Sequence, residues 1–235
     1  QLLKKPAFAY CVYLGYYLTQ KLGYAFDTMR LRQHSPNEMA HYADDAWDLE
    51  IKTQQFGCVE ICGIHDRTDY DLKRHSQYSN QNFEIAMGSD PKAKEIPQIL
   101  EIAFGPDRII YTLLETCFEV EDERIILKLI PDLAPNTVAV FPLIRNKEEI
   151  LKLSKEVHKT LIDHRIVSFF DSSGSIGKRY RRQDELGTPF CVTIDYESLD
   201  GKDVTLRERD TMKQKRVKIS DLAKTIQQEL KIESD

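Results

Sequence analysis

The sequence lacks the patterns that mark most metal-binding and disulfide-rich proteins. Its five cysteines are an odd number, widely spread, and none of them forms a Cys-x-x-C pair. A structural zinc site needs several closely spaced cysteine and histidine ligands, and no histidines occur at the i, i+4 spacing of a helical zinc motif. We therefore expect no metal site, and reduced thiols of the kind found in the cytoplasm.

Long apolar runs are absent as well. The most apolar segment, residues 7–18, is too short to span a bilayer, and lysines flank it. Its four tyrosines suit a signal peptide poorly, and no small-residue cleavage site follows. We expect a buried helix over residues 6–22, ended by Gly23, and no membrane partner.

An excess of positive charge is also missing. The net charge is −5 and the pI is about 5.8, whereas a dedicated nucleic-acid-binding protein is usually basic. A local basic face can still bind RNA within an acidic protein. The chain is 41% hydrophobic and free of repeats, so it predicts one large globular domain or two modest ones.

The first half of the chain predicts strands separated by helices. Residues 48–64 alternate as two strands around a turn, residues 96–103 form another strand, and residues 107–118 form a helix. Ser35 and Glu38 match a capping box and predict a helix over residues 36–47. The polar residues 65–95 predict a loop or insertion.

The second half alternates β and α units, after a domain boundary that we place near residue 125. Strands are predicted at residues 137–144, 165–170, 190–195 and 203–208. Helices are predicted at residues 147–164, at residues 178–186 and after Ser220. Asn146 and Glu149 predict a capping box, and Asp200-Gly201 predicts a hairpin. The pattern favours a small mixed sheet with helices on both faces.

Four segments of the chain resemble glycyl-tRNA synthetases of the archaeal and eukaryotic type, which are class II aminoacyl-tRNA synthetases. They are residues 30–53, 59–72, 104–115 and 171–199, and the similarity continues through residues 205–219. The resemblance implies the C-terminal half of such an enzyme, with an α+β fold. Residues 1–125 would be the last part of an antiparallel catalytic sheet, and residues 126–235 an α/β anticodon-binding domain with a mixed sheet.

The implied activity is ATP-dependent joining of glycine to tRNA-Gly, by a homodimer in the full-length protein. ATP would bind with Mg²⁺. Glycine first attacks the α-phosphate of ATP, and a ribose hydroxyl of the tRNA then attacks the adenylate. Both steps depend on positioning and charge neutralisation rather than on a protein nucleophile. The resemblance places Glu60, Ile61 and Arg108 at ATP, and it makes Arg108 the catalytic residue.

The resemblance also places Glu101 and Ala103 at glycine, where the glutamate would hold the ammonium group. Ala103 departs from the family, which has serine there, and one lost hydrogen bond costs on the order of 1 kcal/mol. Cys58 replaces a tryptophan and His65 an alanine, both close to the site. Alternatively, Arg108 is a surface arginine and Glu101 is an ordinary strand glutamate.

In the second half, residues 173–179 read SGSIGKR and resemble a phosphate-binding loop without the spacing of a Walker A motif. The basic residues that follow are our candidates for tRNA contacts: Lys178, Arg179, Arg181 and Arg182. A solvated basic face is the alternative.

The first two class II signatures are absent from this sequence, so we expect the 235 residues alone not to aminoacylate. Two other functions stay open. One is a non-catalytic relative such as a DNA polymerase accessory subunit, and Ala103 and Cys58 favour this alternative. The other is a tRNA-binding module.

Overall fold

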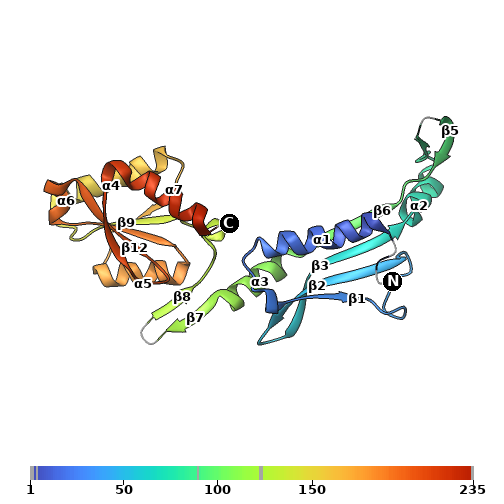
Figure 1. The fold of residues 1–235 in the computed structure, drawn as a ribbon, viewed down its shortest axis with the longest axis horizontal. Helices are drawn as coiled ribbons and strands as arrows, with labels where there is room; N and C mark the ends of the chain where they lie inside the picture. The colour runs from blue at the N-terminus through green and yellow to red at the C-terminus, as the bar shows by residue number, and fades with distance from the viewer. Residues whose placement is uncertain (1–2, 4, 89, 122–123, 234–235) are drawn as a thin grey trace. The chain divides into compact units, whose positions relative to one another are not determined.

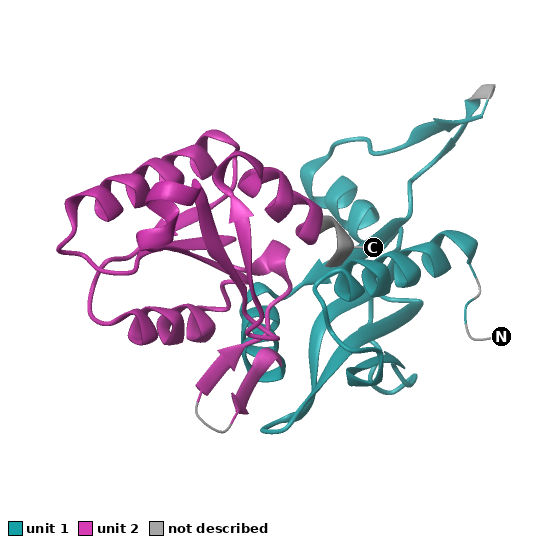
Figure 2. Ribbon diagram, turned by 60° about the vertical axis from the view of Figure 1, so that its left-hand side comes forward, with its two compact units in different colours: residues 1–116 teal, residues 117–235 magenta. Residues whose placement is uncertain are grey.

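The computed structural model describes residues 3, 5–88, 90–121 and 124–233. Its contacts divide the chain into two compact units, Gln1–Thr116 and Cys117–Asp235 (Figure 2). This division lies before our boundary near 125, because the hairpin of β7 (Phe118–Glu121) and β8 (Arg124–Leu127) groups with the second unit. Arg124 fixes the hairpin there: its buried guanidinium donates to the Arg209 main-chain oxygen at 2.8 Å.

The first unit is built on a four-stranded antiparallel sheet. Its strands lie in the order β1 (Met29–Gln33), β2 (Asp45–Thr53), β3 (Gly57–Thr68) and β6 (Ile99–Phe104). The predicted strand pair and the strand at 96–103 are therefore confirmed. Helix α3 (Pro106–Cys117) follows the last strand, as predicted.

Helix α1 (Pro6–Gln20) lies along one face of this sheet (Figure 1). Phe8 and Val12 are buried, and Gly15 permits close packing, because a Cβ there would lie 3.0 Å from Ile64 Cδ1. Our prediction of a buried helix holds for this face only. Tyr10 and Tyr13 are 61% and 59% exposed, so the helix has one packed stripe and one aromatic solvent-facing stripe.

Two predictions for the first unit are wrong. Residues 36–47 form no helix, since β2 already begins at Asp45. Glu38 Oε2 does accept a hydrogen bond from the Ser35 amide at 3.0 Å, but this contact closes a turn. Residues 65–95 contain the end of β3, helix α2 (Tyr70–Ser79) and the hairpin of β4 (Ile85–Met87) and β5 (Asp90–Glu95); residue 89 lies outside the described residues.

The second unit is a five-stranded mixed sheet. The strands lie in the order β10 (Ser168–Phe170), β9 (Val138–Pro142), β11 (Phe190–Ile194), β12 (Asp203–Glu208) and β13 (Gln214–Lys218). The first three are parallel, and the last two pair antiparallel. All four predicted strands are confirmed, whereas β13 was not predicted. The helices of this unit are α4 (Glu148–Asp163), α5 (Ile176–Leu186), α6 (Tyr196–Gly201) and α7 (Leu222–Glu233). It also contains the short 3₁₀ turns η2 (Pro131–Leu133) and η3 (Ile219–Asp221), and the first unit contains η1 (Phe26–Thr28).

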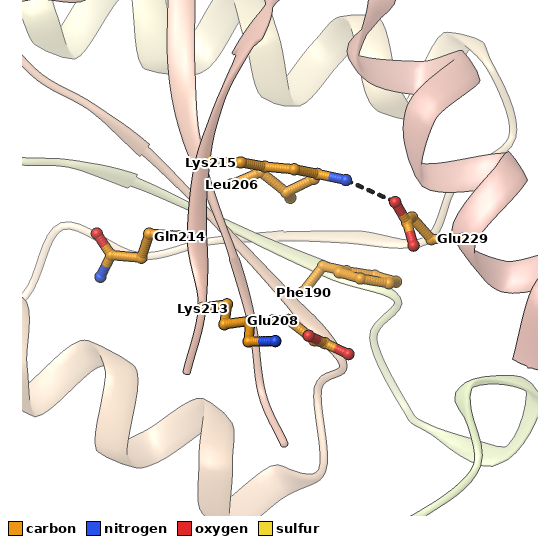
Figure 3. Close-up of a pocket in the computed structure, with 7 residues that line it drawn as sticks. All are labelled: Phe190, Leu206, Glu208, Lys213, Gln214, Lys215 and Glu229. Atoms are coloured by element: carbon orange, nitrogen blue, oxygen red, sulfur yellow. Dashed lines mark hydrogen bonds and ion pairs between the residues drawn. The ribbon is translucent and has the colours of Figure 1, made fainter. Parts of the chain in front are cut away.

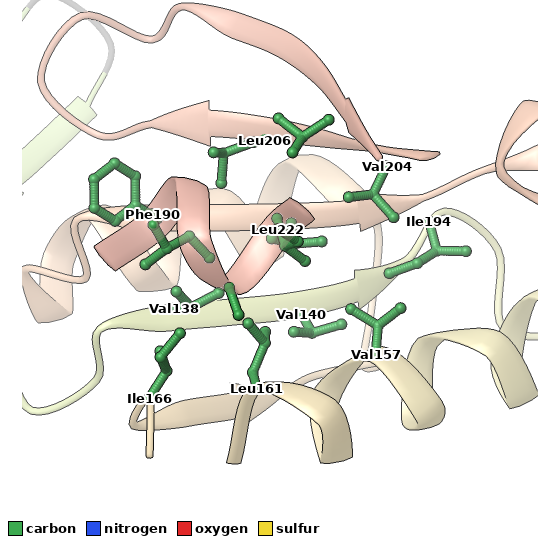
Figure 4. Packing of buried hydrophobic residues seen from close by; sticks show 14 of the residues in the cluster. Val138, Val140, Val157, Leu161, Ile166, Phe190, Ile194, Val204, Leu206 and Leu222 are labelled. Carbon is green, nitrogen blue, oxygen red and sulfur yellow. The ribbon is translucent and has the colours of Figure 1, made fainter. Parts of the chain in front are cut away.

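Helices cover both faces of this sheet, as predicted. Val138 and Val140 of β9 belong to the main core, which includes Val157 of α4 and Leu222 of α7 (Figure 4). The alternate residues Ala139 and Phe141 are also fully buried, and they pack with Tyr180 of α5 on the other face. A strand that is buried on both faces has no polar alternation, which explains why residues 137–144 form a continuous apolar run.

Two local signals in the second unit were misinterpreted. Helix α4 begins after Lys147 without a side-chain cap, so Asn146 is not the N-cap. Asp200 and Gly201 end helix α6 instead of forming a hairpin turn, and Lys202 adopts the left-handed conformation at φ 49°. The true capping box lies at Asp195, whose Oδ1 accepts from the Ser198 amide at 3.0 Å.

Candidate functional site

The sheet of the first unit carries acidic and basic side chains on the face opposite α1. Asp48 and Glu50 alternate with the core residue Leu49, yet they are only 3% and 5% exposed. Arg32 of β1 neutralises both: its Nη2 lies 2.6 Å from Asp48 Oδ2 and its Nε lies 2.9 Å from Glu50 Oε1. Buried carboxylates need such partners. We did not identify this network from the sequence, although the charge alternation in residues 30–32 and 48–50 was the signal for it.

Arg108, in the first turn of α3, reaches back to β3. Its Nη1 lies 3.0 Å from Glu60 Oε2 and donates to the Glu60 main-chain oxygen at 3.1 Å. The two side chains are 55% and 43% exposed, so both remain accessible to a ligand. The Gly105 amide donates to the Ile61 main-chain oxygen at 2.9 Å, which anchors the start of α3 on β3. The Ile61 side chain is 1% exposed and belongs to the core.

Glu101 and Ala103 lie on β6, opposite His65 and Gly63 of β3. Glu101 is held by Arg67, whose Nη1 donates to its Oε2 at 2.6 Å. The same guanidinium donates from Nε to Asp71 Oδ2 at 2.6 Å and lies 4.0 Å from the centre of the Tyr42 ring. This hydrogen bond from Arg67 holds the pKa of Asp71 below its usual range. Arg67 thus fixes the position of the Glu101 carboxylate.

These two groups of residues share one face of the sheet. A Cβ on Gly63 would lie 3.5 Å from Glu60 Oε1, so the Glu60 carboxylate lies on the face towards which Gly63 would project. Ala103 is paired with Gly63, and Glu101 is two residues away on the same strand, so both side chains project to that face. The structure therefore brings Arg108, Glu60, Glu101 and Ala103 together, while the Ile61 side chain stays buried.

In the second unit, a pocket of about 490 Å³ lies at the carboxyl ends of the parallel strands. Its walls are the loop after β9 and the start of α5: Leu143, Ile144, Arg145, Asn146, Gly174, Ser175, Ile176 and Arg179. β9 lies between β10 and β11, and α4 and α5 pack on opposite faces. Ligands of open α/β sheets bind outside the strand ends at such a reversal of strand order.

The four predicted tRNA-binding cations have different environments. Lys178 is exposed, and Arg181 and Arg182 are partly exposed. Arg182 Nη2 lies 2.5 Å from Asp171 Oδ2. Arg179 departs from our prediction, because it is 2% exposed and donates to three main-chain oxygens, those of Pro142, Ser173 and Gly174. Its burial lowers its pKa, and its role is to shape the loop in front of α5.

A second pocket of this unit, of about 290 Å³, lies on the face covered by α7 (Figure 3). Phe190 and Leu206 form its apolar floor. Lys215 and Glu229 are joined across it by an ion pair of 2.5 Å, and Glu208, Lys213 and Gln214 complete the lining. The sequence contained no recognisable signal for this pocket.

Two further findings concern the described part of the chain. It contains no helix of the length and apolarity that crossing a membrane requires. Within the same residues, no group of three or more histidine, cysteine, aspartate or glutamate side chains is placed to hold a metal ion.

Known proteins match most of this chain in sequence. Residues 137–229 match the family described as Anticodon binding domain. The chain is 33% identical to the glycine–tRNA ligase of Methanocaldococcus jannaschii, over 98% of the chain and 53% of that protein. It is 44% identical to the ligase of Borreliella afzelii, over 87% of the chain and 46% of that protein, and 35% identical to that of Methanothermobacter thermautotrophicus, over 88% and 49%. The chain thus spans about half the length of the curated relatives it matches. Over most of its length the chain is thus similar to glycine–tRNA ligases, and residues 137–229 of its second unit match an anticodon-binding domain.

Proposed function

We propose that this chain supplies part of the adenylate site and the anticodon-binding domain of a glycine–tRNA ligase. The observation that supports the proposal is the shared polar face of the first unit, where Arg108 and Glu101 project on the same side of one sheet. In the first step, the glycine carboxylate attacks the α-phosphate of ATP and pyrophosphate leaves. Arg108 neutralises charge on the phosphate, and Glu101, oriented by Arg67, accepts hydrogen bonds from the glycine ammonium.

The residues on this face also fit Mg²⁺ bound with ATP. Mg²⁺ in nucleotide sites takes one or two carboxylates in addition to phosphate oxygens and water. Glu60 offers such a carboxylate, because its side chain is 43% exposed beside Arg108. The ion would supply charge neutralisation on the phosphates, and Glu60 would orient both Arg108 and the metal.

The second unit would bind tRNA-Gly. Lys178, Arg181 and Arg182 lie on α5, whose first residues line the pocket, and the start of a helix with nearby positive charge suits a phosphodiester backbone. We further place the complete ligase in the cytoplasm as a homodimer. The cytoplasmic assignment is supported by Cys62 and Cys191, which are buried and form no disulfide.

A non-catalytic, DNA-binding relative is the second candidate, and Ala103 and the exposed Cys58 are the observations in its favour. Thermal unfolding of the chain with and without ATP and Mg²⁺ separates the two. A ligand that binds the native state raises the midpoint, so the ligase assignment predicts a rise with nucleotide. Binding of primer-template DNA with no nucleotide effect would support the alternative instead.

A further inference from the structure

The smallest residues of the polar face lie side by side at its centre. Gly63 of β3 is paired directly with Ala103 of β6, and the pairing places both on the face that carries Glu60 and Glu101. One residue pair further along, His65 is paired with Glu101. A shallow floor without long side chains therefore lies between the Arg108–Glu60 ion pair and the Arg67–Glu101 ion pair.

The imidazole of His65 leans over this floor. A Cβ built on Gly63 would lie 2.9 Å from His65 Cε1 and 3.6 Å from its Nδ1, so the ring occupies the space that a side chain at position 63 would need. Closely packed carbon atoms approach to about 3.5–4.0 Å, so a side chain at position 63 would require the ring to shift.

Aromatic neighbours hold the His65 ring in this position. Its centroid lies 6.1 Å from that of His34, edge to face, and 6.4 Å from that of Tyr42. His34 is in turn fixed by its Nε2, 2.8 Å from Asp48 Oδ2, and Tyr42 by the Arg67 guanidinium at 4.0 Å. His34 and Tyr42, which contact the ring, are thus themselves held by Asp48 and Arg67 of the polar face.

We propose that His65 is the residue that excludes amino acids with a side chain from this site. The inference rests on the proposed function, in which Glu101 holds the ammonium of the substrate. An ammonium at Glu101 places the α-carbon over Ala103 and Gly63, where the imidazole lies along the β3 side. A hydrogen on the α-carbon fits beside the ring, whereas a methyl group meets it.

The test compares two non-hydrolysable adenylate mimics, glycyl-sulfamoyl-adenosine and L-alanyl-sulfamoyl-adenosine. Their dissociation constants are measured by calorimetry for the 235-residue chain and for its His65→Ala variant. One methyl group in a close-fitting site discriminates by about 10-fold or more, so the unmodified chain is expected to prefer the glycyl mimic by that factor. His65→Ala is expected to lower the ratio to about 3-fold or less, with glycyl affinity nearly kept.

His164→Ala serves as the matched control, since this exposed histidine lies in the second unit and should leave the ratio unchanged. His65→Asn, which keeps a shorter polar side chain, gives an intermediate ratio and covers the case of an unstable alanine variant. An unchanged ratio in both His65 variants, or equal binding of both mimics to the unmodified chain, would overturn the inference while the proposed function stands. Failure of the glycyl mimic to bind the unmodified chain would remove the proposed function and the inference together.

Discussion

Arg108 contacts Glu60 through two different acceptors, its carboxylate at 3.0 Å and its main-chain oxygen at 3.1 Å. The main-chain contact fixes the arginine in place even when the carboxylate turns to another partner. A half-exposed, pre-positioned guanidinium suits a site whose chemistry consists of neutralising phosphate charge.

Arg108→Ala should weaken binding of the glycyl-adenylate mimic by about 10- to 100-fold, because a charge-assisted hydrogen bond contributes about 1.5–3 kcal/mol. Arg108→Lys should recover only part of the loss, since an ammonium cannot make the forked contacts. Calorimetry on both variants measures this. Arg74→Ala, an exposed arginine of α2, is the control. Equal affinity of Arg108→Ala and the unmodified chain would argue against a nucleotide at α3.

Arg67→Ala should change how the stability of the first unit depends on pH. In the folded chain the Arg67 hydrogen bond lowers the pKa of Asp71, whereas in the unfolded chain this carboxyl titrates near its ordinary value of about 3.9. Asp71 therefore stabilises the fold above that value, and the contribution is lost as the pH falls through the folded pKa.

Urea unfolding at a series of pH values between about 7 and 3 tests this expectation. The Arg67→Ala variant should be less stable at neutral pH and lose less stability on acidification than the unmodified chain. Parallel pH profiles for the two proteins would show that the ion pair has no such role.

The cysteines should differ widely in reactivity. Burial raises the pKa of both Cys62 and Cys191 to about 12, and the thiolate is the reactive form. Cys58 is exposed, because a bulge at Leu49/Glu50 shifts the register between it and Cys62. Iodoacetamide at pH 8 should therefore modify Cys58 first and reach Cys62 and Cys191 only on unfolding. Peptide mass spectrometry over time measures the order, and early labelling of Cys62 would contradict the packing of α1 on the sheet.

Arg179 and Lys178 should respond in opposite ways to replacement by alanine. Arg179→Ala removes the donor to three main-chain oxygens, of which that of Pro142 is buried, at a cost of about 1–3 kcal/mol to the second unit. Lys178→Ala should change stability by less than about 0.5 kcal/mol but weaken tRNA-Gly binding and flatten its salt dependence. Unfolding curves and fluorescence anisotropy with labelled tRNA measure the two effects. A stable Arg179→Ala variant would mean that the guanidinium does not support the loop.

The long periodic elements were predictable from sequence because their patterns report burial directly. The apolar run of β9 and the stripe of Ile150, Val157 and Leu161 in α4 match the observed core. The failures concern signals with more than one structural use. A hydrogen bond such as that between Ser35 and Glu38 can close a turn as well as begin a helix. Helix α2 has no buried residues and the β7–β8 hairpin has few buried apolar ones, so neither segment shows a clear hydrophobic period.

For the site, family resemblance and geometry supplied different parts. The resemblance selected Arg108, Glu60 and Glu101, which the sheet brings to one face. It also selected Ile61, and the run of basic residues selected Arg179; both of these side chains are buried. The charge of a residue does not distinguish an exposed arginine from a buried arginine that donates hydrogen bonds to a loop. The Arg32–Asp48 pair and the ring of His65 depend on strand register, which residue types alone did not specify.

The most direct test is a crystal structure of the chain grown with glycyl-sulfamoyl-adenosine. The mimic should lie across the polar face of the first sheet, with its sulfamoyl group at the Arg108 guanidinium and its ammonium at the Glu101 carboxylate. Density for the mimic elsewhere, or Arg108 and Glu101 on opposite sides of it with neither in contact, would contradict the assignment of this face as the adenylate site.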